Sequence, residues 1–501
     1  MRKLLLTTAI LTLWGSVNIM AQTAQDTVYV FKEDQPKGHK FIPAPPDSLS
    51  TDFIDDMTQW QWGKKQRETP RGEQADRESL WRPEIMRTVM AEVLELDTIS
   101  DEATPALSRL LVKTYNTGDQ SAGVAKDSVT RTRPFLMMNE DLWARWDTEF
   151  LRTNSSFPSG HSAFGWATAL VFAEMWPELQ DTILRRGFLF GENRVITGAH
   201  WQSDVYAGYL CGAACVARAH TNPELEKDIL AARAEYARLK GLPADYDPVS
   251  KADVPYGERF LNNPVDTTSY RYLADVMRYW KARELRETDR GKRAAVEAEY
   301  SVNMMSQIYG EALGITISPE TTPSICSLLE VVLTRASDIA DRLKPIRFRK
   351  RPFVQLGEPS SVPGDEEKER GKSSFPSGHT NLGWSTALVM AEVAPECQDE
   401  VLRRGYDYGY NRLIVGYHWA SDIEASRPLA SALIARLHAD ASFRQLIAAA
   451  RAEYVQATTG IAPAVAVAPS VSSLTFRIDG TPATDNTRGI VIKNGQKVVV
   501  R

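Results

Sequence analysis

The sequence predicts an all-α protein that consists of two tandem helical bundles and a small, β-hairpin-rich C-terminal appendage. Three observations predict this fold class. Residues 155–210 recur at 373–428 with 33 identities in 56 positions, which identifies a tandem duplication. Within each copy the apolar residues recur at helical spacing, without the alternation typical of strands. Only the end of the chain, 474–501, alternates at a period of two.

The first 21 residues are predicted to be a secretory signal peptide. Met1-Arg2-Lys3 is a short basic start, an apolar stretch runs to Val17, and Ala21 provides a small residue for cleavage before Gln22. We therefore expect an exported protein. Its destination is the periplasm or, if the C-terminal tail is a sorting signal, the cell surface or the outside of the cell.

An offset of 218 residues relates the two copies and sets the expected boundaries. Six of the seven histidines form pairs at this offset, and only His39 is single. Turn-forming residues from Gly241 to Pro248 mark a linker between the copies. The expected parts are a signal peptide at 1–21, a first repeat at 45–240, a linker at 241–262, a second repeat at 263–458, a second linker at 461–473 and a β tail at 474–501.

Individual elements follow from local patterns. Residues 163–178 place one apolar face at helical spacing, which predicts a helix. Residues 224–239 predict a charged, alanine-rich amphipathic helix that ends before Gly241. In the tail, Asn494-Gly495 separates two alternating segments and favours a type I′ hairpin turn. The tail is therefore expected to be a small β unit.

The composition excludes several classes of protein. Outside the N-terminus no run of 18 apolar residues occurs, which argues against an integral membrane span after signal cleavage. A net charge of −5 argues against a nucleic-acid binder. The four cysteines are too few for a disulfide scaffold and form no metal-ligand pattern, although their disulfide status stays open. Cys211 and Cys215, stacked on one predicted helix, have a poor geometry for a bridge.

Each repeat carries one lysine, two arginines and a Ser-Gly pair in the same order. Three cations neutralise a phosphate dianion, and the free N–H groups at a helix start, where Ser-Gly is expected, bind its oxygens. Any one of these residues alone is more often a surface ion-pair partner, but the ordered set occurs twice. The predicted phosphate-binding residues are Lys126, Arg133, Ser159, Gly160 and Arg194 in the first repeat, and Lys344, Arg351, Ser377, Gly378 and Arg412 in the second.

Two histidines and an aspartate in each repeat predict a double displacement at phosphorus. His200 and Asp204 are four residues apart, so on a helix they would share a face, and the carboxylate would hold the proton of one ring nitrogen. The other nitrogen would attack phosphorus and form a phosphohistidine, while His161 would protonate the leaving alcohol and later activate water. Because three cations stabilise the charge, we expect neither a metal nor another cofactor. The corresponding residues of the second repeat are His418, Asp422 and His379.

His220 and His438 are left outside the predicted sites. Each follows an Ala-Arg-x segment at a predicted helix end. A histidine at that position interacts favourably with the last carbonyl groups of its helix, which is a sufficient explanation for it.

The motifs resemble those of the phosphatidic-acid-phosphatase type 2 superfamily, and each half is similar to the bacterial class A non-specific acid phosphatases. The likeness covers nearly all of 41–240 and 263–458. In the first repeat it includes Phe41-Ile-Pro-Ala-Pro-Pro46, Arg67-Glu-Thr-Pro-Arg-Gly72, Arg131-Thr-Arg-Pro-Phe135, Gly165-Trp-Ala-Thr-Ala-Leu170 and Gly198-Ala-His-Trp-Gln-Ser-Asp204.

This resemblance implies an all-α bundle that hydrolyses phosphomonoesters at acid pH without a metal ion. Separately, we expect vanadate to inhibit the protein, because vanadate adopts the five-coordinate geometry of phosphoryl transfer and should bind the same cationic pocket. The resemblance implies the phosphate ligands given above. It also implies that His200 and His418 are nucleophiles, that His161 and His379 are general acids, and that Asp204 and Asp422 orient the nucleophiles. The physiological substrate stays open among nucleotides, sugar phosphates and phosphoamino acids.

A few positions depart from the family pattern. Asparagine precedes the last phosphate-binding arginine, at Asn193 and Asn411, where the family usually has serine, so we expect tuned activity. The first repeat has Ala199 and Tyr209 where the family prefers tyrosine and arginine, whereas the second keeps both family residues, at Tyr417 and Arg427. A highly charged segment, 358–372, is expected to border the second site.

Two other functions fit part of the pattern. A vanadate-dependent haloperoxidase shares the anion pocket, but the likeness to acid phosphatases around Arg67-Glu-Thr-Pro-Arg-Gly72 weakens that alternative. One repeat is alternatively a non-catalytic phosphate-binding module that braces the other. We expect instead two complete sites and an intramolecular pseudo-symmetric pair of repeats, because a tether of about twenty residues gives a roughly millimolar effective concentration. Association beyond this pair stays open.

The tail has a second, shorter likeness. A Phe-Arg-Ile-Asp-Gly480 segment, followed by Gly489-Ile-Val-Ile-Lys-Asn-Gly and a basic C-terminal end, resembles the C-terminal sorting domains of type IX secretion. The resemblance implies transport to the cell surface or beyond. Whether the tail is cleaved stays open.

Overall fold

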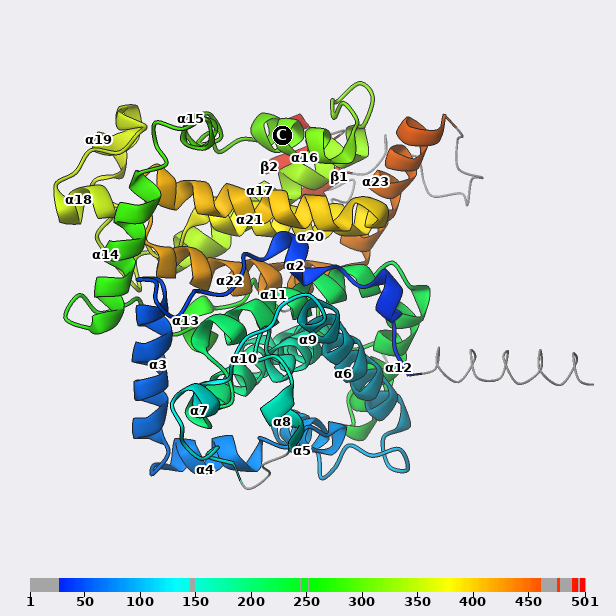
Figure 1. The fold of residues 1–501 in the computed structure, drawn as a ribbon. Coiled ribbons are helices and arrows are strands. Elements are labelled where there is room, and N and C mark those ends of the chain that lie inside the picture. The colour runs from blue at the N-terminus through cyan, green and yellow to red at the C-terminus, as the bar shows by residue number, and fades with distance from the viewer. Residues whose placement is uncertain are drawn as a thin grey trace, which may run out of the picture.

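The computed structural model describes residues 27–144, 149–243, 245–250 and 252–460, together with the backbone of three strands in the tail. Both repeats are helical, which confirms the predicted all-α class (Figure 1). The predicted signal peptide, the 461–473 linker and the Asn494-Gly495 turn lie outside the described residues.

Ten helices of the described chain form the first repeat, and each has a counterpart about 218 residues later in the second. The first ten are α3 (Phe53–Gln66), α4 (Pro70–Arg77), α5 (Pro83–Val93), α6 (Pro105–Lys126), α7 (Pro134–Met137), α8 (Glu149–Thr153), α9 (Gly160–Met175), α10 (Gln180–Ile196), α11 (Gln202–Ala219) and α12 (Pro223–Leu239). Their counterparts are α14 (Tyr270–Arg283), α15 (Asp289–Val296), α16 (Val302–Leu313), α17 (Pro323–Leu343), α18 (Pro352–Leu356), α19 (Glu366–Glu369), α20 (Gly378–Val393), α21 (Gln398–Ile414), α22 (Ala420–His438) and α23 (Ala441–Thr459).

Proline and capping residues explain where several helices begin. Proline occupies the first position of α4, α5, α6, α12 and α17, where its missing N–H has no helical partner to lose. The Ser159 hydroxyl caps α9 by accepting a hydrogen bond from the Ser162 N–H at 3.2 Å. The predicted helix at 224–239 is confirmed as α12, and Gly241 follows it with a φ of 64°.

α9 and α20 are the central helices of the two repeats. Every residue from His161 to Met175 is buried, so α9 is covered on all sides and not only on the single apolar face that its spacing predicted. The reason is its central position, because α6, α10 and α11 all pack against it.

Glycines set the close approach of α9 to α10. A Cβ atom on Gly187 would lie 2.3 Å from the Cβ of Ala169, and one on Gly165 would lie 2.7 Å from the Cβ of Phe190. Only glycine therefore permits this distance between the helices. The second repeat places Gly405 in the same way between α21 and α20.

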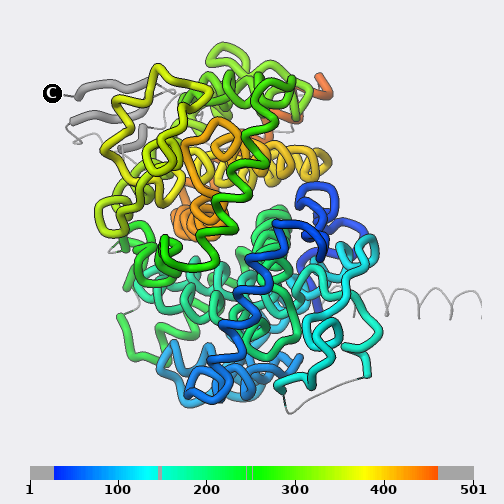
Figure 2. The backbone as a smooth tube through the Cα atoms, turned by 60° about the vertical axis from the view of Figure 1, so that its left-hand side comes forward, coloured from blue at the N-terminus to red at the C-terminus, as the bar shows by residue number. Residues whose placement is uncertain are grey.

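The two repeats contact each other through equivalent helices. α9 packs against α22, and its counterpart α20 packs against α11. Two short helices, α2 (Gly38–Phe41) and α13 (Gly257–Phe260), precede the two bundles and pack on the opposite ones, α2 on α21 and α13 on α10. α3 and α14 also lie side by side (Figure 2). The contacts are therefore reciprocal.

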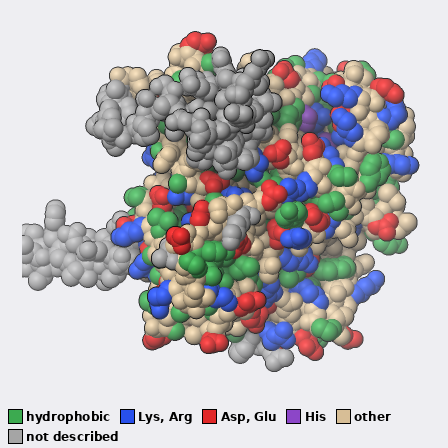
Figure 3. Space-filling view, turned by 180° about the vertical axis from the view of Figure 1, so that it is seen from behind, with side chains coloured by type: hydrophobic (Ala, Val, Ile, Leu, Met, Phe, Trp, Pro, Cys, Tyr) green, Lys and Arg blue, Asp and Glu red, His purple; other side chains and the backbone are tan. Residues whose placement is uncertain are grey.

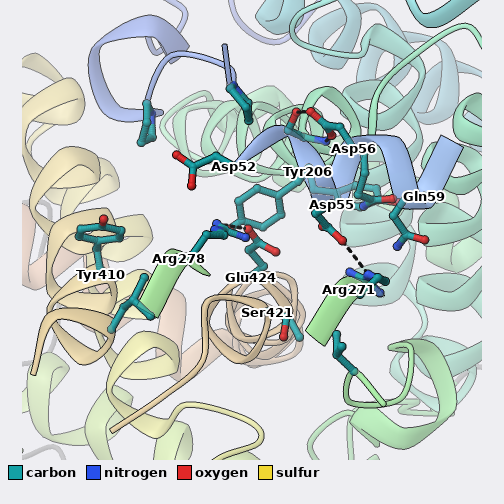
Figure 4. A pocket seen from close by; sticks show the side chains of 18 of the residues that line it. Asp52, Asp55, Asp56, Gln59, Tyr206, Arg271, Arg278, Tyr410, Ser421 and Glu424 are labelled. Atoms are coloured by element: carbon teal, nitrogen blue, oxygen red, sulfur yellow. Dashed lines mark hydrogen bonds and ion pairs between the residues drawn. The ribbon is translucent and has the colours of Figure 1, made fainter. Parts of the chain in front are cut away.

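A cavity of about 550 Å³ lies between the repeats (Figure 4). Ion pairs cross the interface along its wall, from Arg271 to Asp55 at 2.8 Å and from Lys281 to Asp52 at 2.5 Å. Among the described residues, no member of the predicted sites lines it. The cavity therefore belongs to the interface.

The tail forms a three-stranded antiparallel sheet in the order β1-β2-β3, which agrees with the predicted β appendage. Its strands are β1 (Thr475–Arg477), β2 (Gly489–Lys493) and β3 (Gln496–Val500). In the register of β2 and β3, Lys493 pairs with Gln496.

The described surface mixes both charges. On the face in Figure 3, lysine and arginine side chains are interspersed with aspartate and glutamate. All four cysteines are described, and all four are free. Within the described part of the chain, none of the helices combines the length and the apolar character that a membrane span needs.

Candidate active site

In each repeat, a tight turn presents the predicted nucleophilic histidine. Gly198, with a φ of 77°, lies between α10 and α11, so His200 lies in the turn that precedes α11. The prediction that His200 and Asp204 share a helix face is therefore wrong. Asp204 is the third residue of α11, and its carboxylate accepts a hydrogen bond from the Trp201 N–H at 2.8 Å, which caps the helix. Gly416, with a φ of 89°, makes the equivalent turn in the second repeat.

One arginine in each repeat fixes which nitrogen of the predicted nucleophile, His200 or His418, carries a proton. Arg133 Nη1 lies 2.9 Å from Nε2 of His200, and Arg351 Nη1 lies 3.1 Å from Nε2 of His418. A guanidinium only donates hydrogen bonds, so Nε2 accepts and bears a lone pair. The ring proton is therefore on Nδ1.

The aspartate lies beside the histidine but does not hold it by a short hydrogen bond. The distance from His200 Nδ1 to Asp204 Oδ2 is 3.7 Å, and the distance from His418 Nδ1 to Asp422 Oδ2 is 3.9 Å. In the second repeat, His418 Nδ1 instead donates to the carbonyl of Ser374 at 2.6 Å. The carboxylate therefore lies beside the ring in both repeats without a short contact to Nδ1.

The sequence analysis missed the arginine that holds this aspartate. Arg131 pairs with Asp204 at 2.5 Å and with Asp56 at 2.6 Å. Burial alone would raise the pKa of Asp204, but Arg131 and His200 lower it below its ordinary value. A signal was available in the sequence, because the three residue types recur at equivalent positions of the second repeat. The counterparts are Arg349, Asp422 and Asp275, with distances of 2.6 and 2.7 Å.

Three cations converge on the first site. Arg133 and Arg194 are each 2% exposed, and Lys126 donates to the Ser155 carbonyl at 2.7 Å. Burial lowers the pKa of Arg194 to about 9, that of Arg133 to about 10 and that of Lys126 to about 7. Cations held this close together without a full set of counterions favour an anionic ligand.

The second site has the same three cations with a different set of partners. Arg412 is 5% exposed, and within the described chain its Nε and Nη1 atoms have no hydrogen-bond partner. Lys344 pairs with Asp341 at 2.8 Å. A buried guanidinium with free N–H groups is costly unless a ligand satisfies them, so Arg412 indicates an anion site.

The remaining predicted phosphate ligands lie at a helix start. Ser159 and Gly160 open α9, and Ser377 and Gly378 open α20. Asp119, which the sequence analysis did not single out, lies beside this turn, and burial raises its pKa to about 6.

The predicted general acids lie in the same pockets. His161 Nε2 donates to the Ser79 carbonyl at 3.1 Å, and His379 Nε2 donates to the Ala298 carbonyl at 2.8 Å. Their Nδ1 atoms are therefore the nitrogens left for proton transfer. Burial, and after it the neighbouring Arg194, hold the pKa of His161 well below its ordinary value.

Asn193 and Asn411, which depart from the family pattern, each hydrogen-bond a glutamate and an arginine next to a predicted site. Asn193 donates to Glu78 at 2.8 Å and accepts from Arg71 at 2.5 Å. Asn411 makes the same contacts with Glu297 and Arg290. Each amide is therefore held between a carboxylate and a guanidinium of its own repeat.

An aromatic side chain near the general-acid histidine differs between the two repeats. Trp81, two residues after Ser79, stacks on Phe150 with 5.7 Å between ring centroids, and both rings are about half exposed. Trp81 corresponds to Tyr300, which packs against His379 instead.

All predicted residues of each set therefore gather within one repeat, around His200 in the first and His418 in the second. Burial, and after it the Arg133 guanidinium, hold the pKa of His200 well below its ordinary value of 6.5, which favours the neutral ring. Among the described residues, no three histidine, cysteine or acidic side chains are grouped as metal ligands.

The repeated helical bundle and its twin cationic histidine pockets define the class of this protein: the chain belongs to the PAP2 superfamily, which residues 108–226 and 325–445 each match. It is 35% identical over 224 residues to a non-specific acid phosphatase of Providencia stuartii, covering 43% of this chain and 90% of that protein.

Two further relatives match a similar length. A non-specific acid phosphatase of Salmonella typhimurium is 36% identical over 189 residues, which are 38% of this chain and 75% of the relative. An acid phosphatase of Zymomonas mobilis is 34% identical over 200 residues, which are 40% of this chain and 76% of the relative. Each match is about as long as one repeat.

Proposed function

We propose that this protein is an acid phosphatase with one active site in each repeat, which hydrolyses phosphomonoesters through a phosphohistidine. One observation carries the proposal: in both repeats, a histidine nitrogen that bears a lone pair lies against buried arginines. Attack on a phosphoryl group needs the lone pair as nucleophile and the cations to neutralise the phosphoryl oxygens. The names of the relatives support the same reaction class.

The first half of the reaction transfers the phosphoryl group to the protein. Nε2 of His200 attacks phosphorus while the ester P–O bond breaks. The electron pair of the P–O bond stays on the leaving oxygen. His161 gives that oxygen a proton and releases an alcohol. The pKa of His161 is low in the empty pocket, but a bound phosphoryl anion favours its charged form.

The second half releases phosphate. A water molecule attacks phosphorus, His161 accepts its proton, and the bond from Nε2 to phosphorus breaks. Lys126, Arg133 and Arg194 carry the charge of the phosphoryl oxygens throughout, so no metal ion is required. His418 and His379 perform the same steps in the second repeat, with Lys344, Arg351 and Arg412.

The two repeats form an intramolecular, pseudo-symmetric pair in this proposal, and each site is complete in its own repeat. The reciprocal contacts between α9 and α22 and between α20 and α11 support the pairing. In the described chain, the candidate residues of the first site fall between Lys126 and Asp204, so none is lent by the second repeat.

Export is part of the proposal and rests on the sequence of the two ends. The basic and apolar start at 1–21 favours secretion, and the likeness of the tail to type IX sorting domains favours the cell surface. Phosphomonoesters outside the cytoplasm are then the substrates.

Hydrolysis of p-nitrophenyl phosphate near pH 5.5 with EDTA present tests the function. We expect turnover that EDTA leaves unchanged, and its loss in the His200→Ala, His418→Ala double variant. Full activity in the double variant, or loss on adding EDTA, would contradict the proposal. Haloperoxidase activity with vanadate in place of hydrolysis would favour the alternative class.

A further inference from the structure

The second site contains a carboxylate at the position where the first contains an amide. In the first repeat, Nη2 and Nε of Arg133 donate to the amide oxygen of Asn154 at 2.7 and 3.2 Å. In the second, Nη2 of Arg351 pairs with the carboxylate of Glu369 at 2.7 Å, and Nε donates to the Glu369 carbonyl at 3.2 Å. The same edge of each arginine is engaged, by a neutral group in one site and by an anion in the other.

This edge of the guanidinium can bind a phosphoryl group, while Nη1 faces the ring of His418. The parallel N–H groups at Nε and Nη2 match two oxygens of a carboxylate or a phosphate. The pair is also well shielded, because the side chain of Arg351 is 3% exposed and that of Glu369 is 20% exposed. Burial would raise the pKa of Glu369, but Lys372 and Arg351 lower it, so the carboxylate stays charged in mild acid.

The segment that carries Glu369 is anchored beside the site. The Ser360 N–H donates to Glu366 at 2.6 Å, and the Ser361 N–H donates to the Val415 carbonyl at 3.1 Å. Lys372 pairs with the other oxygen of Glu369 at 2.7 Å. The carboxylate is thus held in place, and Lys372 is available to keep it when an incoming anion takes Arg351.

We propose that Glu369 is the residue that sets the anion affinity of the second site: its carboxylate competes with the phosphoryl group for Arg351. The second site therefore binds phosphate and phosphomonoesters more weakly than the first, and the whole protein has two Michaelis constants. The inference rests on the proposed function only in assigning Arg351 to the phosphoryl group.

The test isolates the second site in a His200→Ala background. In that background Glu369→Gln lowers both the KM and the inhibition constant of inorganic phosphate by about fivefold, as expected for removal of a partly shielded competing charge. The matched control is Glu367→Gln on the same short helix. Its side chain is 93% exposed and pairs only with Arg370 among the described contacts, so both constants stay unchanged.

A reciprocal variant and a binding measurement complete the test. In a His418→Ala background, Asn154→Asp raises the KM of the first site. Calorimetry of inorganic phosphate, on full-length protein whose first site is silenced by Arg133→Ala and Arg194→Ala, shows tighter binding with Glu369→Gln. An unchanged or weaker phosphate affinity in folded Glu369→Gln overturns the proposal. Phosphate binding without hydrolysis in every variant would contradict the proposed function and leave this test intact.

Discussion

The imidazole rings of His220 and His438 stack against each other, 3.9 Å apart between centroids, and one ring comes from each repeat. His220 Nε2 lies 3.1 Å from Glu174, and His438 Nε2 lies 2.9 Å from Glu392. His438 Nδ1 also donates to the Ile434 carbonyl one turn earlier, the helix-end contact that its sequence position predicted. These equivalent histidines therefore join the repeats through a buried cluster with two carboxylates.

The first prediction concerns the dependence of stability on pH. Burial by itself would lower the pKa of His438, but the charge of Glu392 outweighs burial. The pKa of His438 is therefore raised from its ordinary value of 6.5 to about 9. The charged ring therefore stabilises the fold below pH 6.5, and this contribution, up to about 3 kcal/mol, is lost as the pH rises through 9.

Thermal unfolding from pH 6 to 9.5 measures this loss. His438→Gln should flatten the curve in this window, whereas the exposed, unduplicated His39→Gln should follow the wild type. A wild-type stability that does not fall between pH 6.5 and 9 would show that the cluster is not charged.

A second prediction concerns the independence of the two sites. His200→Ala alone should leave the second site working with its own KM, because each set of residues lies within one repeat. Steady-state kinetics of the two single variants measure this directly. Their rates should add up to that of the wild type. Complete loss of activity in one folded single variant would mean a site shared across the interface.

Anion binding gives a third prediction. Arg194→Ala together with Arg412→Ala should weaken inhibition by vanadate and by phosphate in parallel, by about tenfold or more. In each site, both anions lose a charge-assisted hydrogen bond from the arginine. Inhibition constants measure the effect. Arg403→Ala is the control, since Arg403 shares α21 with Arg412 but pairs with Glu400 at the surface. Unchanged inhibition in the double variant would place the anion elsewhere.

The fourth prediction uses the lysine of the first site. Burial, and after it Arg133, lower the pKa of Lys126 to about 7. Lys126 is charged below this pH and neutral above it, so kcat/KM of the first site, measured in a His418→Ala background, should fall as the pH rises through 7. Lys126→Arg should carry this limb to higher pH. Superimposable pH profiles with and without Lys126→Arg would show that Lys126 does not bind the anion.

A fifth prediction concerns the packing of α9 on α10. Gly187→Ala should destabilise the protein by about 2 kcal/mol, because the new Cβ meets Ala169 at 2.3 Å. Gly123→Ala, where no atom lies within 4 Å of the new Cβ, should stabilise by about 0.5 kcal/mol. Denaturant unfolding of both variants provides the comparison. Equal stabilities would mean that the helices move apart without cost.

Much of the architecture was predictable from the sequence because the duplication supplied two independent copies of each pattern. Every residue of the two predicted sites lies in its own repeat around His200 or His418. Proline positions and the Ser159 cap fixed where helices begin, since those preferences are local.

Other features depended on contacts between distant segments, and spacing does not encode these. His200 and Asp204 were expected on one helix, but the aspartate caps α11 and the histidine lies in the turn before it. The sequence showed Arg131 only as part of a motif. The structure adds its partner Asp56, which lies 75 residues earlier in the chain.

The sequence by itself determined the class of this protein and the duplication, and it predicted which residues gather around His200 and His418, because these follow from residue identity and order. Only the tertiary structure showed that His220 stacks on His438. It also showed that Glu369 pairs with Arg351 and that Asn154 accepts from Arg133, the equivalent arginine of the first repeat. The physical reason is that a side chain's partner depends on how helices pack, and packing joins residues that no local pattern relates.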